Sequence, residues 1–488
     1  MGEHDPLEVL FNPKSIAVVG ASRNPFKPNY NLLANLVKLK FPGRLYPVNP
    51  NVQEIDGMKA YPSLKSIEGE IDMVVSSVPA VATLDVIKDC AEKKVKVVVI
   101  VSGGFSEVGQ DGRKAQEEIA HLLKQNGIRA IGPNCLSPIN TSNNLAVGFD
   151  SHEKLHRGSI SFILQSGFYE PRLEWMFWDF NLGINKLIDL GNKMDINEVD
   201  ALEYFASDPT TKVIAIHLES IAGDGRRFFD LLKETSKEKP IVVLKSGRTE
   251  AGAAAASSHT GAIVKGSRIV FDTALTQTGV IRAHTLEEFF DFAKVFEFIM
   301  PLKLRGNRIA IACLSGGEGA IVTDMCQERG FSLAKVNPET HVRLQKVSPP
   351  WEVPPNPFDI GVSGQFHPME VYKAFFETTA DDTNVDCIAA QLPTFRNIPI
   401  PDEFLRVFLQ PFFMAKARKP VAIWLVEETQ RYRAPIQLLE ANHVPVYPSA
   451  DRAIRALSAL YRYSSMTKES GRHTRGTTWN DRSANSSL

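Results

Sequence analysis

Cysteine is scarce in this chain of 488 residues, long apolar runs are absent, and neither sign of charge prevails. The five cysteines are scattered, odd in number and nowhere arranged as CxxC, which excludes a disulfide framework and a zinc site of the ribbon type. No apolar run approaches the roughly 18 residues that span a bilayer. The formal net charge of −1 gives no electrostatic basis for binding nucleic acid or a membrane surface.

The remaining composition is that of a globular protein, with 43% hydrophobic and 23% charged residues. The length suffices for about three domains of roughly 150 residues each. The first ten residues, MGEHDPLEVL, are acidic and contain no apolar core of a signal peptide. We therefore expect a cytoplasmic protein without a metal site.

Residues 1–150 alternate short β-branched runs with helical patterns, which predicts a parallel, doubly wound, Rossmann-like α/β domain. Such sheets bind ligands beyond the carboxyl ends of their strands. The residues at these predicted ends are small, polar or turn-forming: Gly20, Ala21, Ser22 and Arg23, then Val48, Asn49 and Pro50, then Ser77, Val78 and Pro79, then Ser102 and Gly103, and finally Asn134. We expect them to line one crevice.

The ligand of this crevice is predicted from the first turn and from the end of the second strand. GASRNP differs from GxGxxG, and PVNPN lacks the acidic residue that would hold a ribose hydroxyl, which argues against a dinucleotide dehydrogenase. Coenzyme A fits better, with Arg23 and Lys27 as candidate phosphate partners. Cys135 has no histidine nearby in the sequence and is expected to be a small buried residue.

A second doubly wound unit, of the flavodoxin-like kind, is predicted over residues 151–300. Gln165, Ser166 and Gly167 end its first strand before an apolar helix, where the Ser166 hydroxyl and the Gly167 backbone would hold phosphate or an acyl phosphate. Residues 244–262, LKSGRTEAGAAAASSHTGA, consist mostly of small side chains and carry His259. A loop of this kind costs little to move, and an imidazole on it suits a nucleophile or a proton carrier. Glu219, at the end of a strand, would fix its tautomer.

The third predicted domain covers residues 301–463 and is again flavodoxin-like. Its Gly-rich turn, residues 315–319, lacks GKS or GKT and is interpreted as structural, and as part of a surface that docks partner domains. Residues 464–488 are polar and without periodicity, which predicts a disordered tail.

These segments, in this order, resemble the motifs of one family. FNPKSIAVVGAS, YPVNPN, SGGFSEVG, IGPNCL, LQSG and above all KSGRTEAGA followed by SSHTGA are similar to the α subunit of the NDP-forming acyl-CoA synthetases. This family is the ADP-forming acetate–CoA ligase branch of the succinyl-CoA synthetase superfamily. The resemblance covers about residues 6–463. Two departures are Phe168-Tyr169, where the family usually has small residues, and Ser137-Pro138, where Gly is common.

The resemblance implies an acid–thiol ligase that interconverts acyl-CoA, ADP and phosphate with acid, CoA and ATP. It implies that His259 becomes the phosphohistidine, that Glu219 steadies it, and that Gln165–Gly167 form the acyl-phosphate pocket. No segment of the chain matches an ATP-grasp domain or a P-loop. We therefore expect a hetero-oligomer with an ATP-grasp β subunit that binds Mg²⁺ with ADP or ATP.

Two other classes of function remain open at this point. If the chain has lost its catalytic activity, it would be a CoA-binding regulatory module. The bulky residues Phe168-Tyr169 beside the predicted acyl site are the feature that favours this alternative. A dehydrogenase is disfavoured by the missing third glycine and the missing acidic residue.

Overall fold

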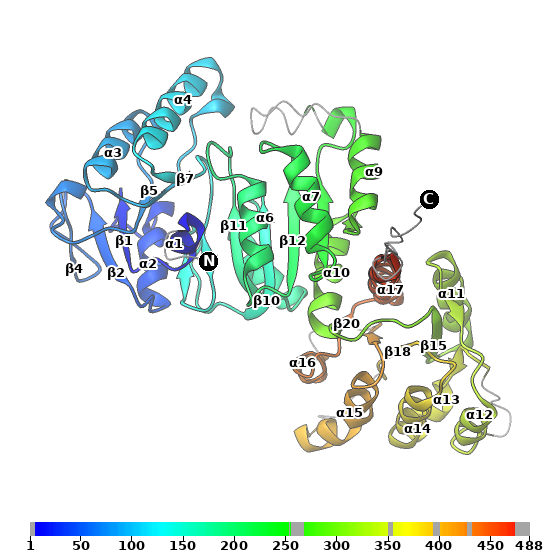
Figure 1. The fold of residues 1–488 in the computed structure, drawn as a ribbon. Helices are drawn as coiled ribbons and strands as arrows, with labels where there is room; N and C mark the ends of the chain where they lie inside the picture. Colours follow the sequence, from blue (N-terminus) through cyan, green and yellow to red (C-terminus); the bar gives the residue numbers. More distant parts are fainter. Residues whose placement is uncertain are drawn as a thin grey trace, which may run out of the picture. The chain divides into compact units, whose positions relative to one another are not determined.

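Three β-sheets organise the protein, two of them parallel and one mostly parallel, and helices pack on their faces (Figure 1). The structure is a computed structural model that describes residues 5–252, 254, 268–349, 355–393, 401–426 and 432–473. The chain divides into two compact units, Met1–Ala293 and Lys294–Leu488. The first unit holds two of the sheets and the second unit holds the third.

The first sheet has five parallel strands in the order β2-β1-β5-β6-β7. Their bounds are β1 Ser15–Val19, β2 Arg44–Val48, β5 Met73–Ser76, β6 Val97–Ile100 and β7 Arg129–Ile131, and the helices between them are α2 Asn31–Lys38, α3 Ala80–Glu92 and α4 Gln110–Gln125. Tyr61 adds a parallel bridge beside β2, so the segments follow the strand order 3-2-1-4-5-6 of a Rossmann fold. All four residues of β6 are buried, as expected for a strand covered on both faces.

The second sheet has seven strands in the order β14-β13-β12-β10-β11-β8-β9. Five strands are parallel, namely β10 Arg157–Leu164, β11 Ile184–Asp189, β12 Val213–Leu218, β13 Ile241–Lys245 and β14 Ile281–Ala283. Their order is that of a flavodoxin-like sheet. The helices include α5 Leu173–Asp179, α6 Glu198–Ser207, α7 Gly225–Thr235 and α9 Arg268–Thr278. Caps explain where two helices begin: Asp224 accepts the first N–H groups of α7, and Asn197 forms a capping box with Asp200 on α6.

The boundary between the first two predicted domains differs from the expected residue 150. Strands β8 Ile139–Asn140 and β9 Leu145–Ala146 already belong to the second sheet, because β8 pairs antiparallel with β11. One hydrophobic core also runs across both sheets. Helix α1 (Pro6–Phe11) contributes Phe11, whose ring stacks on Tyr204 of α6 at a centroid distance of 5.2 Å. Figure 1 shows α1 between the first sheet and α6. The two sheets therefore form one unit.

The second unit contains a parallel sheet in the order β16-β15-β18-β19-β20, with β17 beside β15. The strands are β15 Arg308–Cys313, β16 Ser332–Leu333, β17 Phe358–Asp359, β18 Cys387–Gln391, β19 Val421–Trp424 and β20 Val446–Tyr447. The helices are α11 Gly316–Glu328, α12 Pro338–Gln345, α13 Gly361–Phe366, α14 Pro368–Asp381, α15 Asp402–Lys416, α16 Arg433–Ala441 and α17 Ala450–His473. This arrangement agrees with the predicted flavodoxin-like order.

Two predicted boundaries of this unit are shifted. The unit begins at Lys294 within helix α10 (Leu286–Ile299), earlier than the predicted start at residue 301. Helix α17 continues to His473, nine residues beyond the start of the predicted tail. Ser464 is buried there, and its hydroxyl accepts a hydrogen bond from the Leu304 N–H at 3.2 Å, so tertiary packing extends the helix where composition predicted disorder.

Candidate functional site

The structure brings the predicted crevice residues to one edge of the first sheet. Gly20 follows β1 with φ +84°, and a Cβ at this position would lie 2.9 Å from Ser77 Oγ, at the end of β5. Strands β1 and β5 are the neighbours at which the strand order reverses, and such sheets bind their ligands at that point. Asn49 donates from Nδ2 to the Ala21 carbonyl at 2.9 Å. Glycine is therefore required where the two loops approach.

The rest of this edge is closed by hydrogen bonds between successive loops. Ser102 Oγ donates to the Val78 carbonyl at 2.5 Å, and the Asn134 N–H donates to the Ser102 carbonyl at 3.0 Å. Ala21, Ser22 and Val48 are buried, Ser77, Val78 and Asn134 are partly exposed, and Arg23, Lys27, Pro50, Pro79 and Gly103 are exposed. The prediction that these side chains share one edge agrees with the structure. Their binding of coenzyme A stays a prediction.

The corresponding edge of the second sheet carries a denser polar cluster. Gln165 directly follows β10 and Glu219 directly follows β12, again the pair of strands at which the order reverses. The Gln165 side chain is buried, and its Oε1 accepts the backbone N–H groups of Glu219 at 2.9 Å and Ser220 at 3.0 Å. Glu219 is also buried. Lys245, at the end of β13, donates to the Glu219 carbonyl at 2.7 Å. The predicted phosphate loop and the predicted carboxylate thus adjoin each other.

His259 lies outside the described residues, as do the other residues of 255–267. Its distance to Glu219 is accordingly not part of the structure, and its pairing with this carboxylate stays a prediction. The segment that leads to it begins at Ser246, whose hydroxyl is hydrogen-bonded to His217 Nε2 at 2.6 Å. The other ring nitrogen of His217 is hydrogen-bonded to the Tyr169 hydroxyl at 2.7 Å. Burial and the nearby Lys245 charge lower the pKa of His217 to about 4, so this ring is neutral at pH 7.

The two bulky residues after the phosphate loop have different environments. Tyr169 is 1% exposed and packs edge-on against His217 and Phe290, so its ring is part of the core. Burial raises the pKa of its hydroxyl. Phe168 is half-buried, and the Arg172 guanidinium lies over its ring at 4.3 Å. Of the two residues, Phe168 is the one whose ring stays accessible beside Gly167.

Three buried charged residues of this edge were not among the predicted site residues. Asp189, which ends β11, accepts the Leu136 N–H at 2.9 Å and also the Ser166 N–H. It therefore joins the loop after β7 to the phosphate loop. Burial raises its pKa to about 6. Lys193 and Glu198 form a buried ion pair with a distance of 3.0 Å between Nζ and Oε2. Asp189 is the last residue of β11, Lys193 lies in the turn after it and Glu198 is the first residue of α6, so no motif of the sequence marks them as site residues.

The turn after β11 closes onto the first sheet. A Cβ on Gly191 would lie 2.3 Å from the Pro133 carbonyl oxygen and 2.6 Å from that of Asn134. The Asn192 N–H donates to the Pro133 carbonyl at 2.9 Å, and its side chain donates to Glu107 Oε2 at 2.6 Å. Within the first unit, the two polar edges are therefore connected by direct backbone contact. Cys135, predicted to be a small buried residue, is 1% exposed in the loop after β7, and burial raises the pKa of its thiol.

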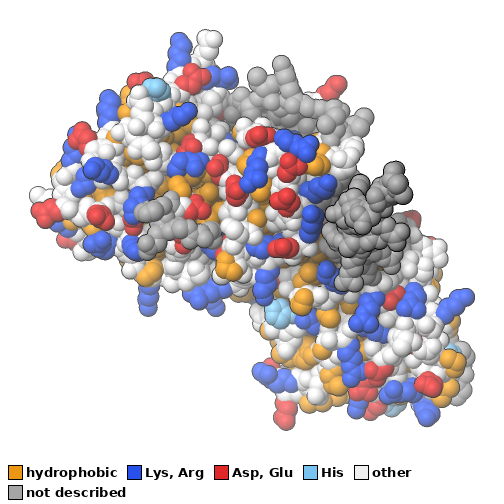
Figure 2. Space-filling model, viewed as in Figure 1, with side chains coloured by type: hydrophobic (Ala, Val, Ile, Leu, Met, Phe, Trp, Pro, Cys, Tyr) orange, Lys and Arg blue, Asp and Glu red, His pale blue; other side chains and the backbone are white. Residues whose placement is uncertain are grey.

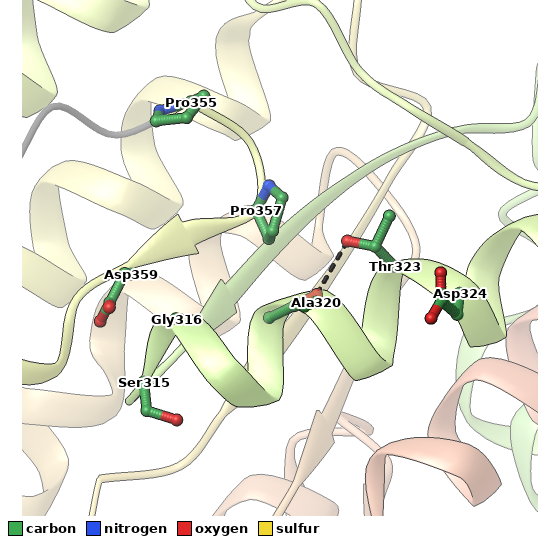
Figure 3. A pocket seen from close by; sticks show the side chains of 9 residues that line it. Ser315, Gly316, Ala320, Thr323, Asp324, Pro355, Pro357 and Asp359 are labelled. Carbon is green, nitrogen blue, oxygen red and sulfur yellow. Dashed lines mark hydrogen bonds between the residues drawn. The ribbon is translucent and has the colours of Figure 1, made fainter.

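The second unit has a pocket of about 400 Å³ at the start of α11. Figure 3 shows Pro355 and Pro357 on one side and α11 on the other, with the Thr323 hydroxyl donating to the Gly319 carbonyl at 2.8 Å. Ser315 caps the helix by accepting the Glu318 N–H at 3.2 Å. The predicted Gly-rich turn is thus a helix start that borders an open pocket.

Two further features concern the described residues as a whole. None of the helices in these ranges is both long enough and apolar enough to cross a membrane, and no cluster of three His, Cys, Asp or Glu side chains within them is arranged to hold a metal ion. Basic and acidic side chains are interspersed over the face drawn in Figure 2, in keeping with the net charge of −1.

Comparison with known families agrees with this architecture. The family model of a CoA binding domain matches residues 14–140, and that of a succinyl-CoA ligase like flavodoxin domain matches residues 157–296. The sheets, their edges and these matches define a protein of the succinyl-CoA synthetase superfamily.

Individual relatives narrow this class. Subunit α of an ADP-forming acetate–CoA ligase II from Pyrococcus furiosus is 35% identical over 456 residues, which are 93% of this chain and 97% of the relative. The ADP-forming acetate–CoA ligase II of Archaeoglobus fulgidus is 34% identical over 94% of this chain but only 67% of its own length. A solved acetyl-coenzyme A synthetase 1 of Candidatus Korarchaeum cryptofilum, in complex with phosphate and ADP, is 34% identical, with a TM-score of 0.85 over 96% of this chain and 98% of its own. The chain belongs to the family of ADP-forming acetate–CoA ligase α subunits.

Proposed function

We propose that this chain is the α subunit of an ADP-forming acyl-CoA synthetase and catalyses the acyl-phosphate half of its reaction. Phosphate held at Gln165, Ser166 and Gly167 attacks the thioester carbonyl, so that a C–O bond forms, the C–S bond breaks and CoA leaves as the thiol. His259 then attacks phosphorus, the P–O bond to the acyl group breaks, and the free acid leaves. The phosphoryl group on His259 passes to ADP. A phosphoramidate retains enough transfer potential for this last step.

The single observation that supports this assignment is the junction of Gln165 with Glu219. Two adjacent backbone N–H groups, of Glu219 and Ser220, donate to the Gln165 amide oxygen at 2.9 and 3.0 Å. This junction puts the loop that would hold phosphate beside the carboxylate that would orient the histidine. Within that scheme, Glu219 accepts an imidazole N–H and offsets the positive charge that develops on the ring during attack.

The CoA substrate would bind at the carboxyl edge of the first sheet. The residues proposed to line the site are Gly20, Ala21, Ser22, Arg23, Lys27, Val48, Asn49, Pro50, Ser77, Val78, Pro79, Ser102, Gly103 and Asn134. The close approach of Gly20 to Ser77 brings the loops after β1 and β5 together at this edge, and the exposed Arg23 and Lys27 would supply cations for the phosphates of CoA. The contact of Gly191 with the loop after β7 supports a path for the thioester between the two edges.

A partner subunit would complete the reaction. The chain matches the Pyrococcus furiosus α subunit almost end to end, but it covers only two thirds of the Archaeoglobus fulgidus ligase. The missing third would correspond to an ATP-grasp β subunit that binds Mg²⁺ with ADP or ATP. We infer a hetero-oligomer in which phosphorylated His259 meets that nucleotide.

The test is transfer of radioactive phosphate to the full chain in the presence of a series of acyl-CoA thioesters, beginning with acetyl-CoA. We expect an acid-labile, base-stable label on the wild-type chain and its loss in His259→Ala. His121→Ala, which removes an exposed histidine on α4, is the matched control and should retain the label. A chain that is stabilised by CoA but acquires no label from any thioester would contradict the ligase assignment and favour a CoA-binding regulatory module.

A further inference from the structure

The ammonium group of Lys193 is buried at the phosphate edge of the second sheet and takes no part in the proposed chemistry. Lys193 is 8% exposed and lies in the turn after β11. Its φ is +56°, a backbone conformation that residues other than glycine rarely adopt. Its Nζ donates to Gln165 Oε1 at 2.9 Å, to Glu198 Oε2 at 3.0 Å and to the Ser220 carbonyl at 2.6 Å. These acceptors use all three N–H groups of the ammonium. Lys193 therefore has no N–H group left to donate to a ligand.

The most consequential neighbour is the Gln165 amide, because its orientation is fixed by three donors. Oε1 accepts from Lys193 and from the backbone N–H groups of Glu219 and Ser220. Rotation of the amide by half a turn would place its NH₂ group against these three donors, leaving all of them unsatisfied. The nitrogen must accordingly point the other way, where it donates to Ser220 Oγ at 3.1 Å. Its second N–H has no acceptor among the described residues.

Glu198 also fixes the position of Lys193, because its carboxylate binds both this ammonium group and the segment after Glu219. Its Oε1 accepts the N–H groups of Ala222 at 2.7 Å and Gly223 at 2.8 Å, while Oε2 accepts from Lys193. The ion pair thus ties the segment after Glu219 to the phosphate loop. Burial lowers the pKa of Lys193, and the Glu198 charge opposes this effect.

We propose that Lys193 is a positioning residue that orients the Gln165 amide, so that its nitrogen donates a hydrogen bond to the tetrahedral phosphate held at Ser166 and Gly167. This inference rests on the proposed function, because it takes the Gln165–Gly167 loop as the phosphate site. Without the ammonium, the amide loses one of three restraints, and the loop presents a donor to the anion less often.

The experiment is a calorimetric titration of the full chain with inorganic phosphate. We expect Gln165→Ala to weaken phosphate binding about tenfold or more, which is the effect of one lost hydrogen bond to a charged group. We expect Lys193→Met to weaken it by a smaller factor, because the amide keeps two of its three restraints. If Lys193 acts through Gln165, the double variant is no weaker than Gln165→Ala alone. Effects that multiply in the double variant would overturn the proposal.

Lys186→Met is the matched control, since Lys186 lies on β11, is 5% exposed and pairs with Asp208 at 2.7 Å. It should lower thermal stability and leave phosphate affinity unchanged, and equal losses of affinity in both lysine variants would contradict a specific role. Gln165→Glu covers the case in which Lys193→Met does not fold. This variant keeps an acceptor toward Lys193 but turns a carboxylate oxygen toward the anion, so phosphate binding should vanish; wild-type affinity would refute the orientation.

The labelling experiment separates this inference from the proposed function. A wild-type chain that binds phosphate but acquires no label refutes the ligase assignment and leaves the titration to decide on Lys193. A labelled wild-type chain whose phosphate affinity is unchanged by Lys193→Met refutes only the positioning role. A wild-type chain with no measurable phosphate affinity overturns the positioning role as well, because the amide would then face no ligand.

Discussion

At the scale of single residues, two buried groups near the phosphate loop titrate with opposite effects on stability. His217 has a folded pKa of about 4, below its unfolded value, so its contribution to stability is lost as the pH falls from about 6.5 toward 4. Asp189 has a folded pKa of about 6, above its unfolded value, so it stabilises the fold as the pH falls from about 6 toward 4. The two contributions, each about 3 kcal/mol, should largely cancel in the wild-type protein.

Single variants should expose each contribution. Relative to wild type, His217→Gln should gain about 3 kcal/mol of unfolding free energy between pH 7 and pH 4, because glutamine retains hydrogen bonds to Tyr169 and Ser246 but does not titrate. Asp189→Asn should lose a similar amount over the same interval. Urea unfolding followed by circular dichroism at several pH values measures both. If the unfolding free energy of both variants changed with pH as it does in wild type, burial would not shift the pKa of His217 or of Asp189 as described.

At the scale of elements, the turn after β11 should tolerate no side chain where it meets the loop after β7. Gly191 has φ +53°, and a Cβ there would collide with two carbonyl oxygens. We expect Gly191→Ala to cost about 2–4 kcal/mol of stability, from backbone strain and overpacking together. It should also raise the KM for acyl-CoA, because the displaced loop includes Asn134.

Gly127→Ala separates the two causes. Gly127 also has a positive φ, +66°, but nothing lies within 4 Å of a Cβ at this position. It should cost only about 1 kcal/mol, from strain, and leave the KM unchanged. Thermal unfolding and steady-state kinetics test both variants. If the two variants lost equal stability and had equal KM values, the contact between the two loops would contribute to neither quantity.

The elements and their edges could be predicted from the sequence because their signals are local. A β-branched run followed by Gly, Ser, Pro or Asn marks a strand end wherever it occurs, and Gly20, Ser77, Gln165 and Glu219 all lie at such ends. Lys193 and Asp189 could not be predicted, since their burial depends on partners from other strands. The same holds for the first domain boundary, which is removed by the packing of Phe11 on Tyr204, and for Ser464, which tertiary contacts keep in a helix.

At the scale of the whole molecule, the two units should unfold separately, with ligands acting on only one of them. Every described residue proposed to bind CoA or phosphate lies within Met1–Ala293. A ligand at one hundred times its Kd adds about 2.7 kcal/mol to the unfolding free energy of the unit that binds it. For a unit of this size, that corresponds to a rise of about 5 °C in Tm. Differential scanning calorimetry should therefore show two transitions, of which CoA raises one.

Variants identify which transition belongs to the CoA site. Arg23→Ala removes an exposed cation at the carboxyl edge of the first sheet and should reduce the shift that CoA produces. Lys124→Ala removes a cation near the end of α4, at the opposite edge of the same sheet, and should leave the shift intact. Loss of the shift in both variants would point to a general charge effect, which added salt would screen. Lys294→Met breaks the buried ion pair with Glu440 and should lower the Tm of the second unit. If CoA raised the Tm of that same transition, CoA would be bound by the second unit. The carboxyl edge of the first sheet would then have to be given up as its site.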